Sequence, residues 1–244
     1  MATDVPALPV PPARLLFSNG ALITITIGAA IAAVVPYDKV FGLVTLGSPI
    51  LRVLLLVTLS AIGLVFAQRI GATITPHDLA HPITTPLLIG AAAAVALTVL
   101  DALTPTALLS IGYAHFISSI PLAVRFIYFM TRAFNENILY RLFLTSTLAW
   151  GIGRASGHRT QRPSGAVFLA AAVLAQCVNI GTNVVIHGGP FTAAQATYDV
   201  VRYVTPGVLW AYLYGTRGFV SAEIASVGCH LFFQPLLGLV FLHG

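Results

Sequence analysis

The chain of 244 residues is 57% hydrophobic and 8% charged, with 12 basic and seven acidic residues and a net charge of +5. A soluble domain has about 25% charged residues, so this composition cannot build a water-facing surface. It predicts an integral membrane protein. Most basic residues flank apolar stretches, which favours anchoring at the membrane surface over nucleic-acid binding.

The apolar stretches predict an all-α fold, a polytopic transmembrane bundle of about eight helices in one integral membrane domain over 1–244. A spanning helix needs about 20 residues, and an open sheet would leave backbone groups unsatisfied in lipid. The predicted spans cover 15–35, 50–67, 86–100, 106–130 with Pro121 interrupting it, 135–150, 164–186, 199–214 and 219–242.

The connecting segments give weaker signals. The start, 1–12, is proline-rich and has no basic region before a cleavage site, so we expect no cleaved signal peptide. Loop 154–162 holds three arginines, which predicts a cytoplasmic position. Loop 75–82 holds two histidines and one aspartate. A zinc site would need a further ligand, so a solvated loop is preferred and no metal site is predicted.

The stretch 134–141 places a carboxylate, two amides and a guanidinium at the mouth of an apolar span. An ionisable group within a membrane is costly and is therefore a functional candidate. The chain has two glutamates, Glu136 and Glu223. Glu136 is expected to be the buried one, since Glu223 is predicted to lie near the membrane surface.

Helical spacing groups these polar residues into faces. Glu136 and Tyr140 are four apart, as are Asn137 and Arg141, so each pair shares a face. Glu136 and Arg141 are five apart and point in different directions in an α-helix. Arg141 is therefore free to contact a neighbouring helix.

Two later spans carry further polar side chains. Gln176, Asn179 and Asn183 form a stripe in the sixth span, and His230 and Gln234 share a face of the eighth. One interpretation is that these groups join helices by hydrogen bonds. The other is chemical: Glu136 acts as a general base towards water, and His230 and Gln234 donate hydrogen bonds to an oxyanion.

Two of these segments carry a resemblance to a known family. Residues 136–141 (ENILYR) resemble the motif E-E-x-x-x-R, and residues 230–234 (HLFFQ) resemble H-x-x-x-N, of the CAAX-protease and bacteriocin-processing (CPBP, Abi) family of intramembrane proteins. Residues 207–218 look like the glycine-containing helix and turn before the family's last histidine. The resemblance covers roughly 120–240, and its motifs lie within 134–240. Asn137 replaces the second acid, and Gln234 replaces the asparagine.

The resemblance implies a bundle similar to that of the CAAX endopeptidases and a set of roles. Glu136 would be the base, and His230 with Gln234 would stabilise the oxyanion. The middle motif, F-x-x-x-H, has no clean counterpart. Its histidine would fall at Asn179, with Asn183 as the other candidate. An amide cannot take up a proton at working pH.

The remaining positions follow from the same comparison. Arg141 and Asn137 join the catalytic set through the first motif, and Tyr140, Asn183 and Gln176 are expected to line a substrate pocket. No cofactor and no metal are expected.

Three functions remain open. The preferred one is a glutamate-dependent intramembrane hydrolase acting on a peptide or a prenylated, lipid-like substrate. The second is a membrane enzyme turned to a non-proteolytic reaction on a prenyl or lipid-like molecule. The third is a non-catalytic immunity or binding protein. The expected partners are membrane lipid and such a substrate, not nucleic acid, in a bacterial inner (plasma) membrane.

Overall fold

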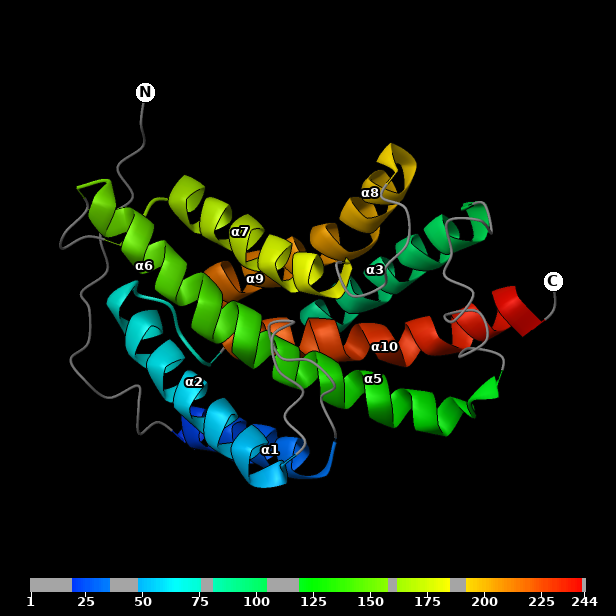
Figure 1. Cartoon of the computed structure of the whole chain (residues 1–244), viewed down its shortest axis with the longest axis horizontal. Coiled ribbons are helices and arrows are strands. Elements are labelled where there is room, and N and C mark those ends of the chain that lie inside the picture. The colour runs from blue at the N-terminus through cyan, green and yellow to red at the C-terminus, as the bar shows by residue number, and fades with distance from the viewer. Residues whose placement is uncertain are drawn as a thin grey trace.

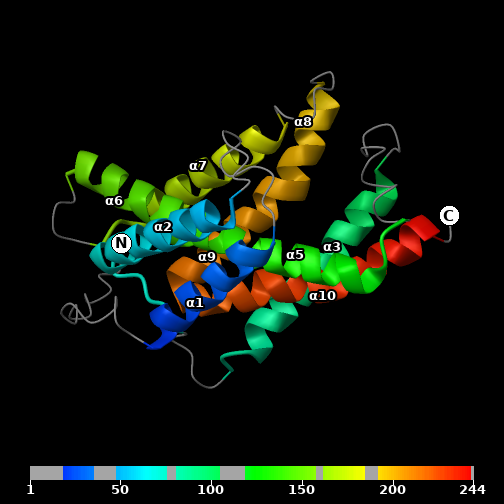
Figure 2. The same ribbon diagram turned by 60° about the horizontal axis from the view of Figure 1, so that its bottom comes forward.

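A computed structural model of the chain describes residues 19–35, 48–75, 81–104, 119–157, 162–184 and 192–242, without the side chains of 182–184 and 241–242. Within these residues all regular structure is helical, as the composition predicts. The helices gather into one elongated bundle, shown in two views in Figures 1 and 2. In chain order they are α1 (Asn19–Val34), α2 (Pro49–Arg69), α3 (Thr84–Leu103), α5 (Leu122–Glu136), η2 (Asn137–Thr145), α6 (Ser146–Ala155), α7 (Gly165–Val184), α8 (Ala193–Asp199), η3 (Val200–Val204), α9 (Thr205–Arg217) and α10 (Phe219–Leu242).

Three of the described helices are long and apolar enough to cross a membrane: α2, α3 and the segment Phe219–Val240 of α10. Many of their aliphatic side chains point outward; Leu54 is 57% exposed and Leu88 is 70% exposed. Charged groups lie inside instead, and the buried ones include Arg52, Asp101, Arg125, Arg141, Arg202 and Glu223. An apolar exterior around a polar interior is expected for a membrane protein.

The predicted boundary between the fourth and fifth spans is wrong. Helices α5, η2 and α6 follow one another without a break, and Figure 1 shows them as a single long helix. Pro121 lies directly before this helix, at its N-cap. No proline lies between Leu122 and Ala155. The polar stretch 131–137 resembles a connection only because its side chains face other helices.

The other predicted spans match helices of the structure. Those at 15–35, 50–67, 86–100, 164–186 and 219–242 correspond to α1, α2, α3, α7 and α10. The span at 199–214 lies within the continuous run of α8, η3 and α9. Residues 76–80 of the histidine-containing loop, 105–118 of the fourth span and 158–161 of the basic loop lie outside the described residues.

The segment η2 is a π-helical turn at the centre of the long helix. In such a segment the backbone hydrogen bonds join residues five apart rather than four. It contacts α2, α7 and α10, and its first six residues are all buried. Gly63 of α2 permits the closest of these approaches, because a Cβ there would lie 2.9 Å from the Leu142 backbone. Such segments often occur at functional sites.

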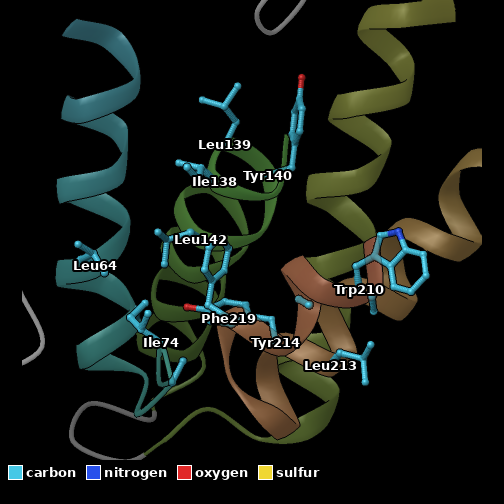
Figure 3. Close-up of a cluster of buried hydrophobic side chains, with 14 of the residues drawn as sticks. Leu64, Ile74, Ile138, Leu139, Tyr140, Leu142, Trp210, Leu213, Tyr214 and Phe219 are labelled. Carbon is cyan, nitrogen blue, oxygen red and sulfur yellow. The ribbon is translucent and has the colours of Figure 1, made fainter. Parts of the chain in front are cut away.

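An apolar cluster surrounds this centre. Leu64 and Ile74, Ile138 and Leu142 of η2, and Tyr214 with Phe219 belong to it (Figure 3). The corner between α9 and α10 is fixed by backbone hydrogen bonds of 2.9 Å from Phe219 to Thr73 and from Val220 to Ile74. The residues that follow α2, Thr73 and Ile74, therefore lie against the beginning of α10.

Candidate functional site

Asn137 and Glu223 form the most deeply buried polar contact between η2 and α10. The Asn137 Nδ2 donates to Glu223 Oε2 over 3.0 Å, and the two residues are 0% and 6% exposed. Glu223 is therefore buried within the bundle, in the second turn of α10. Glu223 Oε1 and Asn137 Oδ1 are buried and find no hydrogen-bond partner in the part of the chain that the structure describes.

Removing this amide should destabilise the protein. In Asn137→Leu the Glu223 carboxyl keeps its burial and loses its donor, so we expect a loss of about 1–3 kcal/mol of unfolding free energy. Thermal unfolding of the purified protein in detergent measures the change. The double variant Asn137→Leu/Glu223→Leu should recover most of the loss. A double variant as unstable as the sum of both single variants would contradict the contact.

Arg141 joins η2 to the sixth predicted span. It is 4% exposed and donates through Nη2 to Gln176 Oε1 over 3.0 Å. The Gln176 amide in turn donates to the Tyr203 carbonyl over 3.1 Å. Gly207 of α9 lies against this amide, since any Cβ there would overlap it. Gln176 therefore connects three helices, and Arg141 braces a neighbouring helix as the spacing permits.

Three further predicted site residues, Asn179, Tyr140 and Asn183, belong to these helices. Asn179 is 4% exposed, one turn beyond Gln176, and Tyr140 is 5% exposed. Figure 3 shows Tyr140 at the edge of the apolar cluster beside Leu139. The side chain of Asn183 lies outside the described residues.

Glu136 has a partner that the sequence did not suggest. Its Oε1 accepts from Arg132 Nε over 2.7 Å, one turn earlier on α5. The Glu136 side chain is 27% exposed, which is more than that of Glu223. The expectation that Glu136 is the more buried of the two glutamates is therefore wrong. It lies at the edge of the polar interior, where a molecule from outside reaches it more easily.

His230 contacts the face of α5 that carries Glu136. Its ring stacks on Phe129 with 5.5 Å between centroids and 15° between planes. Phe129, Arg132 and Glu136 follow at i, i+3 and i+7, so they share that face. No hydrogen bond links Glu136 to His230 among the described residues, but the two lie within electrostatic range. The Glu136 carboxylate extends back along α5 to Arg132, one turn from Phe129.

The two polar side chains predicted on α10, His230 and Gln234, both have unsatisfied hydrogen-bonding atoms within the described residues. Among the described residues, His230 Nδ1 and both amide atoms of Gln234 are buried without a hydrogen-bond partner. Gln234 is 0% exposed. Buried polar groups without partners are rare in folded proteins, and a functional role is one of the accepted reasons for them.

A second polar network was not foreseen. Asp101 at the end of α3 is 1% exposed. It accepts from Arg202 Nε over 2.8 Å and from the Tyr198 hydroxyl over 3.0 Å. The Arg202 guanidinium lies 4.7 Å from the ring of Phe233 on α10. This network fixes α8 and η3 against α3 and α10, beside His230. The only sequence signal for it was two charged residues within apolar stretches.

Arg141 lies within electrostatic range of both Glu136 and Glu223. The described residues hold no group of three or more histidine, cysteine or acidic side chains that could bind a metal. The described interior thus holds buried carboxylates, guanidinium groups and amides, with the Glu136 carboxylate at its edge. Comparison with protein-family models, curated proteins and solved structures gives no match.

Proposed function

We propose that this chain is a divergent member of the CPBP (Abi) family and a glutamate-dependent intramembrane hydrolase of a bacterial inner membrane. Its substrate would be a peptide or a prenylated, lipid-like molecule with a carbonyl group that water attacks. One observation carries this proposal. The α5 face that carries Glu136 packs antiparallel against α10, with Asn137 bonded to Glu223 and Phe129 stacked on His230, and among the described residues His230 Nδ1 and the Gln234 amide have no hydrogen-bond partner.

In this reaction Glu136 takes a proton from water while the water oxygen attacks the carbonyl carbon. The N–H groups of His230 and Gln234 hydrogen-bond the oxyanion that forms. The carbon–nitrogen bond then breaks, and Glu136 returns the proton to the departing amine. Arg132 holds the carboxylate in place through a charge-assisted hydrogen bond.

A non-hydrolytic reaction on a prenyl or lipid-like molecule is the second candidate. Two features favour it: Arg132 already occupies one Glu136 oxygen, and Asn179 stands where a group able to take up a proton is expected. In that reaction Glu136 would move a proton on the substrate without a water, and the product would contain no added oxygen.

The oxyanion assignment is tested by removing the donors one at a time. In Gln234→Leu and in His230→Phe we expect turnover of a prenylated peptide to fall by about 10²- to 10³-fold, with KM little changed. Product formation is followed by mass spectrometry on protein in lipid nanodiscs. Thr147→Val serves as the control, since that hydroxyl bonds its own helix at Phe143 and is remote from α10. Unchanged turnover in both variants would reject the role.

A further inference from the structure

One end of the bundle is strongly basic. Helices α2, α6 and α9 end there and α7 begins there, on the left in Figure 1. It carries Arg69, Arg154, Arg162 and Arg217, and the described stretches 48–75, 146–157, 162–184 and 205–217 contain no aspartate or glutamate. Of the described acidic residues, three lie in α3, α5 and α8, and Glu223 is buried in the second turn of α10.

Two of these arginines lie over one aromatic ring. The guanidinium carbons of Arg69 and Arg154 are 5.3 Å and 5.5 Å from the centroid of Trp150. Phe66 completes the group, because its ring packs 4.9 Å from Trp150 and also lies 5.3 Å from Arg69. A cation over an aromatic face is attracted to it, which holds the guanidinium plane while its N–H edge remains available.

A third arginine is held close by. Arg162 donates to the Gly215 carbonyl over 2.8 Å, and its side chain lies against Gly71, two residues beyond Arg69. Its bond to the end of α9 fixes the position of its positive charge. Arg69, Arg154 and Arg162 are all exposed. Positive charges at this end of the bundle, with no acidic residue in the described stretches that carry them, attract an anion.

The position of Arg69, Arg154 and Trp150 relative to the membrane indicates which anion binds there. Arg69 is the last residue of an apolar helix long enough to cross a membrane, so it lies where the hydrocarbon ends. Tryptophan favours the same level, and arginine binds phosphate through two parallel N–H groups. We propose that Arg69 and Arg154, held on Trp150 and supported by Arg162, bind the phosphate of an anionic phospholipid headgroup at the cytoplasmic face.

The test compares two lipids on the whole chain. Protein in nanodiscs is titrated with phosphatidylglycerol or with phosphatidylcholine, and bound lipid is counted by native mass spectrometry. Two arginines near an anionic headgroup favour it by about 30-fold, from roughly 1 kcal/mol each. Wild-type protein should show that preference, and Arg69→Gln/Arg154→Gln should lose nearly all of it. Each single glutamine variant should lose about 5-fold.

Three controls make the outcome decisive. Arg132→Gln removes an arginine of α5 and should leave the preference unchanged, which excludes a general effect of charge. Arg69→Lys/Arg154→Lys keeps both positive charges but lacks the planar guanidinium groups, and it should retain part of the preference for phosphatidylglycerol. Equal binding of both lipids by wild-type protein would overturn the proposal. Displacement of bound lipid by millimolar inorganic phosphate would overturn the headgroup assignment and identify a free-phosphate site.

Discussion

Glu136→Gln should reduce hydrolysis by about 10²- to 10⁴-fold, the range that a general base contributes. The glutamine amide occupies the same volume and still accepts from Arg132, but it cannot take a proton from water. Since the Glu136 side chain is 27% exposed, the substitution should leave the protein folded. Turnover of a prenylated peptide, followed by mass spectrometry, gives the result.

Arg132→Gln is the matched control for this variant. It removes the ion pair but keeps the carboxylate that acts as base, so hydrolysis should continue at a lower rate because Arg132 no longer holds that carboxylate. An exposed pair of this kind contributes about 0–1 kcal/mol, and stability should change little. If Glu136→Gln and Arg132→Gln reduced turnover equally, the loss of the ion pair would explain both results, and the role of Glu136 as general base would be contradicted.

Asp101→Leu should cost about 3–5 kcal/mol of unfolding free energy, the largest stability effect in the described part of the chain. The substitution leaves the Arg202 guanidinium buried without its carboxylate, and a buried charge without a partner is strongly destabilising. It also removes the acceptor of the Tyr198 hydroxyl. Unfolding by denaturant in mixed micelles measures the loss, together with a greater mobility of α8 and η3.

The double variant Asp101→Leu/Arg202→Met separates charge from packing. With both charges gone the interior is apolar, and much of the stability should return. Methionine also keeps contact with the Phe233 ring that Arg202 covers. A double variant no more stable than Asp101→Leu alone would contradict the assignment of the loss to an unpaired charge.

The sequence predicted the apolar spans well because length and hydropathy alone determine them. α2, α3 and α10 begin and end within a few residues of the predicted positions. It failed at 131–137, where polar residues that face other helices look the same as polar residues in a loop. Hydropathy records how polar a residue is and does not record where it points, so one long helix was divided.

The candidate site likewise combines features that the sequence predicted with features that it could not predict. Helical spacing correctly predicted that Arg141 and Glu136 contact different neighbours. It could not predict partners from other helices, such as Glu223 for Asn137 or Gln176 for Arg141. Those contacts depend on how helices distant in the sequence pack, which no local pattern specifies.

The same limit explains why Asp101 and Arg202 were overlooked. Each is a single charged residue in its own stretch, 101 positions apart, and only the packing of η3 against α3 joins them. Two separate charged residues in apolar helices are therefore a signal for a buried pair, although the sequence does not say which residues pair.

Incorporation of oxygen-18 from labelled water tests the central claim most directly. With wild-type protein in nanodiscs and a prenylated peptide substrate, the new carboxylate should carry one oxygen-18 atom, and Glu136→Gln should form almost none of this product. A product that forms at the same rate in Glu136→Gln, or that contains no oxygen from water, would contradict hydrolysis by Glu136.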